Sequence, residues 1–332
     1  MTLPTRPLGT SGLEITSIGL GTWAIGGGGW SYGWGPQDDA QSLLTMHRAV
    51  ELGINWLDTA GVYGHGHSEE VCARFLKEVP DDRRPLVFTK CGPTWDDRDP
   101  YKEEPSDLSP ANIRRHCEDS LRRLGVERLD LLQFHWPDDG KVAIEDSWAE
   151  MARLVDEGKV RLAGVSNFDT GLLARCEAIR HVDSLQQEFS LIERRTAGKE
   201  LVWVREHGTG LLCYSPMGMG QLTDGFTAQR VRQMPDSDWR HREFREPALS
   251  RNLALRDALR PIAARHEATV MSVAVAWLLA WDGVTAAIVG GRRPEQIDGW
   301  IGAAGLRLTG DDLSEIADAV RATGAGEGPD RP

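Results

Sequence analysis

The sequence has few cysteines, and none of them are at the spacing of a metal or redox motif. Five occur among 332 residues, and no two are separated by only two residues. They are Cys72, Cys91, Cys117, Cys176 and Cys213. This scatter argues against a disulfide-rich scaffold and against a Cys-x-x-Cys zinc or redox site. We therefore expect reduced thiols, most of them buried.

The sequence also lacks a long apolar segment and an excess of positive charge. Its longest nearly apolar stretch, residues 270–281, is shorter than the roughly 20 residues that cross a bilayer. The opening MTLPTRPLGT has no apolar signal-peptide core. Lys and Arg number 38 against 50 Asp and Glu, which gives a net charge of −12 without a basic run. We expect a cytoplasmic protein whose main partner is neither a membrane nor nucleic acid. Its oligomeric state cannot be read from these features.

A dinucleotide-binding glycine motif is missing as well. The run Gly26–Gly29 lacks the Gly-x-Gly-x-x-Gly spacing and is typical of a loop. This weakens a doubly wound open sheet, which is the rival fold. What the sequence does contain is a regular alternation of short β-rich runs and helix-period segments. The predicted strands are 15–22, 54–60, 86–90, 129–136, 160–167, 184–190, 210–216 and 285–291. The predicted helices are 38–53, 67–79, 110–124, 145–157, 169–180, 197–207, 250–266 with 270–281, and 294–303.

Apolar strands that alternate with helices indicate an α/β protein with a parallel sheet covered by helices. Eight such units predict a (β/α)₈ TIM barrel, with residues 1–332 forming a single domain. Additional segments are expected to be a hairpin at 7–15, a long polar loop at 217–249, an extra C-terminal helix at 310–322 and a disordered tail at 323–332. The helix at 110–124 carries clear end signals: a capping Ser109, then Pro110, and a terminating Gly125.

Four ionisable residues follow three successive predicted strands. Asp58, Lys90 and His135 stand at strand ends, and Tyr63 lies in the loop just beyond the first. The C-terminal ends of barrel strands form the active-site face, so these groups are expected to meet there. A free tyrosine has a pKa of about 10, and we expect the Lys90 ammonium to lower that pKa. Asp58 would hold Lys90, and His135 would donate a hydrogen bond or serve as the acid.

These residues lie in motifs that resemble the aldo-keto reductase family over about residues 7–320. The motifs, in the family's order, are GLGTW (19–23), LDTAGVYG (57–64), FTK (88–90), QFHWPD (133–138), GVSNF (164–168), LQQEFSLIER (185–194), YSPMGMG (214–220) and IVGGRRPEQI (288–297). The nearest branches are the bacterial general-stress and sugar-aldehyde reductases. The resemblance implies an alcohol:NADP⁺ oxidoreductase that reduces small-molecule aldehydes and ketones without a metal. Tyr63 would be the proton donor of a catalytic tetrad.

The resemblance also implies a nicotinamide cofactor site. Its residues would be Gly21, Thr22, Trp23, Ser166, Asn167, Gln186, Tyr214, Ser215, Pro216, Met217, Gly218, Gly290, Arg292, Arg293 and Gln296. Among these, Ser166, Asn167 and Gln186 would hold the carboxamide, and Tyr214 would stack on the ring. Arg292 and Arg293 suit a 2′-phosphate, so NADPH is the expected cofactor. The family often has Glu-Asn where Gly299 and Trp300 stand and a basic residue where Met219 stands. These departures leave NADH open.

Other interpretations concern single residues. Each tetrad residue alone is more often structural, and only their joint order favours catalysis. His65 and His67 resemble a metal pair, but no acidic or cysteine cluster supports one, so we expect a solvated loop.

The substrate pocket is predicted to be lined by Trp23, Trp30, Trp34, Trp95 and Trp136. The alternative function is a cofactor-binding redox sensor or regulatory subunit with slow turnover.

Overall fold

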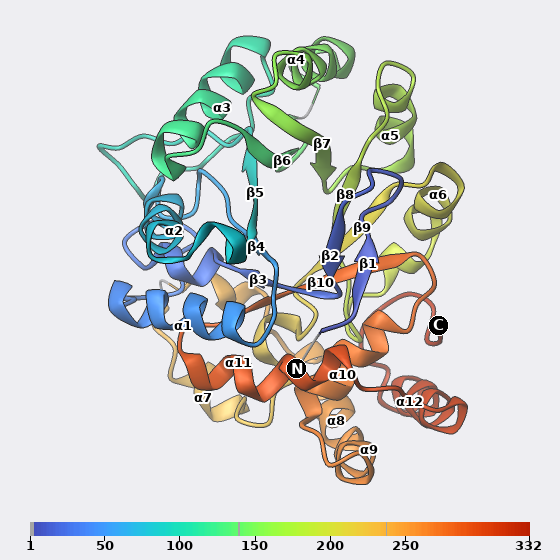
Figure 1. The fold of residues 1–332 in the computed structure, drawn as a ribbon. Coiled ribbons are helices and arrows are strands. Elements are labelled where there is room, and N and C mark those ends of the chain that lie inside the picture. Colours follow the sequence, from blue (N-terminus) through green and yellow to red (C-terminus); the bar gives the residue numbers. More distant parts are fainter. Residues whose placement is uncertain (1–2, 139, 237) are drawn as a thin grey trace.

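A computed structural model describes residues 3–332 except Asp139 and Ser237. Eight parallel strands close into a barrel in the order β10-β3-β4-β5-β6-β7-β8-β9, and helices surround it (Figure 1). The strands are β3 (Ile18–Gly21), β4 (Trp56–Asp58), β5 (Leu86–Cys91), β6 (Leu129–Phe134), β7 (Val160–Ser166), β8 (Ser184–Glu188), β9 (Gly210–Tyr214) and β10 (Val284–Gly290). The predicted (β/α)₈ barrel is confirmed.

Except for α7, which lies in the segment predicted to be a loop, the helices follow the predicted positions with small shifts. They are α1 (Asp39–Glu51), α2 (His67–Glu78), α3 (Pro110–Leu124), α4 (Ile144–Asp156), α5 (Thr170–Glu177), α6 (Lys199–His207), α7 (Ala228–Arg232), α8 (Ala248–Ala258), α9 (Arg260–Arg265), α10 (Val270–Leu279), α11 (Pro294–Trp300) and α12 (Gly310–Thr323). Among the described residues, no single helix is long and apolar enough to cross a membrane, although one bent pair, Ala248–Arg265 with Val270–Leu279, meets the length and composition criteria. All five cysteines are buried and free.

Some local expectations need correction. Ser109 occupies the N-cap position of α3, but its side chain makes no capping bond. The predicted helix at 250–266 breaks at Leu259, just before Pro261, which has no N–H to continue the ladder. The 217–249 segment is not only loop, because it contains α7 and two 3₁₀ turns, η4 (Gly218–Gly220) and η5 (Trp239–Arg242).

The predicted N-terminal hairpin is present and closes one end of the barrel. Its strands β1 (Thr5–Pro7) and β2 (Glu14–Thr16) pair in antiparallel fashion. Leu8, Leu13 and Ile15 are buried together with side chains of the barrel interior, namely Trp56, Phe88, Leu131, Leu162, Leu212, Ala286 and Ile288. This apolar plug leaves the other end, where the strands finish, for polar chemistry.

The segment after α12 folds back onto the protein, which differs from the expected disordered tail. The backbone N–H of Arg194 donates to the carbonyl of Glu327 at 2.8 Å. The Arg194 guanidinium donates to the carbonyl of Ala325 at 3.0 Å, and Ala325 is buried. Sequence composition alone suggested a solvated tail, but a buried arginine that needs acceptors fixes it in place.

Candidate active site

The alternation of strand side chains explains how the candidate residues reach the open end of the barrel. Trp56 and Phe88 point into the barrel interior. Side chains two positions apart share one face of a strand, so Asp58 and Lys90 point inward one layer higher. In the same way, Leu212 belongs to the interior layer and Tyr214 lies above it at the end of β9.

Asp58, Lys90 and Tyr63 form a buried contact network at this end. The Lys90 ammonium donates to Asp58 Oδ1 at 2.6 Å and to the carbonyl of Thr59 at 2.9 Å. It also reaches Tyr63 Oη at 3.4 Å. The side chains of Lys90 and Asp58 are 0% and 3% exposed. Burial lowers the pKa of Lys90, while the Asp58 carboxylate opposes that shift and favours the charged form.

The electrostatics of Tyr63 differ from the expectation. Burial first, and then the Asp58 and Tyr214 side chains, raise the pKa of Tyr63 well above its ordinary value. The prediction that Lys90 would lower this pKa is therefore wrong for this structure, because burial outweighs the ammonium. Tyr63 remains a neutral phenol that can donate a hydrogen bond.

His135 completes the group from the loop after β6. Its ring meets the Tyr63 ring edge-on, with centroids 5.6 Å apart. Burial, and secondarily Lys90, lower the pKa of His135 well below its ordinary value, so the imidazole is neutral. Among the described residues, neither ring nitrogen has a hydrogen-bond partner, and Nδ1 is fully buried. A neutral imidazole with a free N–H can donate to an incoming oxygen.

The predicted carboxamide residues also meet at the rim. The Gln186 amide donates to Asp58 Oδ2 at 2.9 Å. Asn167 donates to Ser166 Oγ at 3.0 Å and accepts from Tyr214 Oη at 2.8 Å. Within the described residues, the Ser166 O–H has no acceptor and Gln186 Oε1 has no donor. One free donor beside one free acceptor is what an amide ligand needs, so this donor set fits a nicotinamide carboxamide.

Backbone strain occurs in the same loops. Asn167, Ser215 and Met219 adopt left-handed backbone angles, with φ of 62°, 53° and 54°. Non-glycine residues rarely do so, and such outliers gather at ligand sites. The tight turn is closed by the Gly218 N–H, which donates to the carbonyl of Ser215 at 2.8 Å. Pro216 and Met217 lie within this turn.

Several side chains that were predicted to bind the cofactor form hydrogen bonds within the protein. The Thr22 hydroxyl donates to the carbonyl of Asp58 at 3.0 Å and is fully buried, so it fixes the strand end instead. Arg292 donates to Gln37 Oε1 at 2.7 Å and also to the carbonyls of Trp34 and Pro36.

Beyond β10, the Gln296 side chain accepts the backbone N–H groups of Arg292 and Arg293 at 2.7 and 3.2 Å, so it caps α11. Gly290 and Arg293 are exposed. No ion pair within the described residues involves Arg293, which leaves its charge available to a ligand.

Most of the predicted pocket tryptophans belong to one aromatic cluster, defined here as Trp23, Trp30, Tyr32, Trp34, Tyr63 and Trp239. Trp23 stacks on Tyr63 with centroids 6.1 Å apart, and Trp30 lies 6.5 Å from Tyr63. Trp95 packs against this cluster, whereas Trp136 is 49% exposed and has no ring contact among the described residues. Trp239 was missed because it lies in a polar segment.

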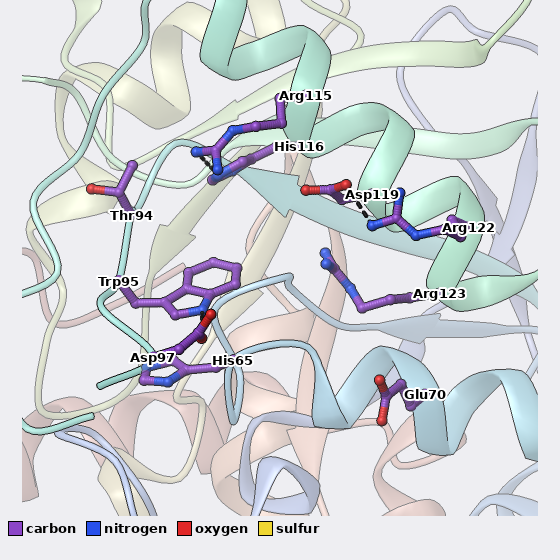
Figure 2. Close-up of a pocket in the computed structure, with 10 residues that line it drawn as sticks. All are labelled: His65, Glu70, Thr94, Trp95, Asp97, Arg115, His116, Asp119, Arg122 and Arg123. Carbon is purple, nitrogen blue, oxygen red and sulfur yellow. Dashed lines mark hydrogen bonds and ion pairs between the residues drawn. The ribbon is translucent and has the colours of Figure 1, made fainter. Parts of the chain in front are cut away.

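A separate cavity of about 390 Å³ is lined by His65 and Trp95 on one side and by side chains of α3 on the other (Figure 2). Among its charged side chains, Arg122 pairs with Asp119 at 2.7 Å and Arg123 pairs with Glu69 at 2.6 Å. Neither Tyr63 nor His135 lines it. The cavity is therefore not the place where a carbonyl would meet the four residues.

The two loop histidines have carboxylate partners. His65 pairs with Glu104 at 2.8 Å, and His67 pairs with Asp39 at 2.8 Å. Because each imidazole is bound to a different carboxylate, they do not point at a common centre. The part of the chain that the structure describes contains no group of three or more His, Cys, Asp or Glu residues arranged to hold a metal ion.

Comparison with known proteins agrees with this geometry. Residues 17–321 match the sequence profile described as the Aldo/keto reductase family. The chain belongs to this family. Aldo-keto reductases use nicotinamide cofactors to interconvert carbonyls and alcohols.

The aldo-keto reductases that resemble this chain include enzymes with small substrates in their names. Aldo-keto reductase YhdN of Bacillus subtilis (strain 168) is 31% identical over 310 residues, covering 93% of this chain and 91% of that protein. The NADH-specific methylglyoxal reductase of Escherichia coli (strain K12) is 30% identical over 332 residues, covering 95% and 98%. The solved structure of the glycerol dehydrogenase AKR11B4 from Gluconobacter oxydans is 34% identical, with a TM-score of 0.87 and coverage of 98% and 97%.

Proposed function

We propose that this protein reduces aldehydes and ketones to alcohols with a nicotinamide cofactor and that Tyr63 is the proton donor. The observation that carries the proposal is the buried contact of Tyr63 with the Lys90 ammonium at 3.4 Å, beside the Asp58 carboxylate and the His135 ring. The bound cofactor supplies the hydride that reaches the carbonyl carbon.

The protein's own residues handle the proton and the charge. Tyr63 donates its O–H to the carbonyl oxygen, and the neutral His135 ring donates a second hydrogen bond to the same oxygen. The raised pKa of Tyr63 does not oppose this step, because the alkoxide that forms is a much stronger base than a phenolate. Lys90 stabilises the phenolate that remains, and Asp58 keeps Lys90 charged and in position.

The residues at the rim would bind the cofactor. Ser166 and Gln186 offer the free donor and acceptor for the carboxamide, and Tyr214 offers its ring. We propose NADPH as the preferred cofactor, with NADH as the alternative, because Arg293 is exposed and forms no ion pair with the residues that the structure describes. A relative is named an NADH-specific reductase, so this preference requires its own test.

Tyr63→Phe tests the proposed function, because it keeps the ring and removes the transferable proton. We expect carbonyl reduction to fall by at least about a hundredfold. The assay follows the loss of reduced cofactor with methylglyoxal as substrate, with and without a chelator. Cofactor affinity, measured by fluorescence titration, should be unchanged and serves as the folding control.

Three outcomes would contradict the proposal. Near-normal turnover by Tyr63→Phe would exclude Tyr63 as the donor. Loss of wild-type activity on chelation would indicate a metal reaction instead. A single stoichiometric burst without further turnover would favour a redox sensor.

A further inference from the structure

Trp239 reaches the candidate site from a part of the chain that the sequence marked only as a polar loop. It lies in η5 and stacks on Trp23, with ring centroids 5.2 Å apart and planes at 25°. Trp23 in turn stacks on Tyr63. A continuous set of ring contacts therefore links η5 to the residue that would donate the proton.

Several contacts fix the Trp239 ring in this position. Its indole N–H donates to the carbonyl of Gly33 at 3.1 Å, which ties η5 to the loop after β3. Its ring also meets the rings of Tyr32 at 5.9 Å and Trp34 at 6.2 Å. The guanidinium of Arg242 lies 5.8 Å from the ring centroid. Aromatic contacts of this kind stabilise a ring beyond simple burial, so more than one interaction holds the Trp239 ring.

The neighbouring residue strengthens the same connection. Arg240 pairs with Asp238 at 2.6 Å and places its guanidinium 4.6 Å from the Trp34 ring centroid. The backbone carbonyl of Trp34 also accepts from Arg292 at 3.3 Å. The loop after β3 is thus held between η5 and the end of β10. As a result, the aromatic side chains of these loops are connected to one another by direct contacts.

We propose that Trp239 is a specificity-determining residue that narrows the space above Tyr63 and restricts the substrate to small aliphatic carbonyls. Tyr63 is only 8% exposed, so the side chains packed around it leave little of the residue accessible. Trp239 limits the space above Tyr63 indirectly, because its ring holds Trp23 against Tyr63. This inference names the substrate class of the proposed reductase and rests on that function.

The experiment compares a small and a bulky aldehyde in wild type, Trp239→Ala and Trp239→Phe. The probes are methylglyoxal and benzaldehyde. Space for one methylene group in an apolar pocket changes discrimination by about 10- to 200-fold. Trp239→Ala removes a whole ring system, so we expect kcat/KM for benzaldehyde relative to methylglyoxal to rise at least about tenfold. Trp239→Phe keeps a stacking ring and should stay near the wild-type ratio.

Two controls separate specificity from general damage. Tyr101→Ala removes an exposed ring, 68% exposed and outside the aromatic cluster, and should leave the ratio unchanged. Cofactor affinity is measured for every variant by fluorescence titration. An unchanged ratio in Trp239→Ala would overturn the inference. Equal losses for both aldehydes, together with weaker cofactor binding, would also overturn it, because Trp239 would then serve the cofactor.

If wild type turns over neither aldehyde, the specificity role is tested by equilibrium binding of the same two aldehydes. Tryptophan fluorescence is the readout of binding. If Trp239→Ala alone then binds benzaldehyde, the specificity role stands and the reductase function fails. If binding of benzaldehyde is the same in all variants, the specificity role fails independently of turnover.

Discussion

Replacing Asp58 with Asn should destabilise the protein strongly, because it leaves a buried charge without its counterion. The Lys90 ammonium is fully buried, and its other acceptors are the neutral carbonyl of Thr59 and the Tyr63 hydroxyl. Breaking a buried ion pair from one side costs about 3–5 kcal/mol. Asp58→Asn should therefore lower the free energy of unfolding by this amount at pH 7, measured from the shift of the urea unfolding midpoint.

The loss should depend on pH, and its sign follows from the pKa of Lys90. Burial already lowers this pKa, and removing Asp58 removes the group that opposes the shift. A lysine whose folded pKa is depressed contributes stability at high pH that is lost as the pH falls through the folded pKa. The difference in stability between Asp58→Asn and wild type should therefore grow as the pH falls.

Two further variants decide whether the charge is the cause. Adding Lys90→Met to Asp58→Asn removes both charges and should recover most of the lost stability, although not the activity. Asp282→Asn breaks the exposed pair of Arg205 and Asp282, whose side chains are 54% and 82% exposed, and should cost less than about 1 kcal/mol. If Asp58→Asn costs no more than Asp282→Asn, Lys90 is not a buried cation and the electrostatic reasoning fails.

The remaining predictions concern the rim. Arg293→Ala should weaken NADPH binding by roughly ten- to a hundredfold more than NADH binding, which is the effect of one charge-assisted hydrogen bond. Fluorescence titration measures both affinities, and equal losses for the two cofactors would contradict this prediction. Arg292→Ala should lower the melting temperature, because the Arg292 guanidinium supports the loop after β3. Burial, Glu193 and Glu243 raise the pKa of Glu188 to about 7. The stability from this raised pKa is lost as the pH rises through about 7. Glu188→Gln should therefore melt several degrees above wild type at pH 8.5 but at the same temperature as wild type at pH 4.5. The same difference in melting temperature at both pH values would refute the raised pKa of Glu188.

The barrel and the position of its rim residues could be predicted because both depend on local patterns. Apolar runs that alternate with helix-period segments specify strands and helices without knowledge of distant contacts. Once Trp56 and Phe88 are assigned to the interior, Asp58 and Lys90 must also point inward, because side chains repeat every two residues. The four candidate residues were therefore predictable from the strand ends.

The hydrogen bonds and ring contacts of individual side chains could not be predicted in this way. Trp239 contacts Gly33 across 206 positions of the chain, and Arg292 contacts Gln37 across 255. No local pattern marks such pairs, because they depend on how loops from opposite ends of the sequence meet at the rim. The pKa of Tyr63 was mispredicted for a related reason, since its burial is a property of the whole aromatic cluster.

The distribution of charge at the rim suggests why the proposed reaction needs little rearrangement. Before reduction, the negative charge of Asp58 balances Lys90, while Tyr63 and His135 are neutral. Proton donation would leave one new negative charge on Tyr63 Oη, which lies 3.4 Å from the Lys90 ammonium. The compensating cation is thus held in place before the charge appears, by a carboxylate that Gln186 also holds. Such preorganisation lowers a barrier because no dipole must turn during the reaction. It follows that Asp58 and Gln186 would act on the rate through Lys90, without touching the substrate.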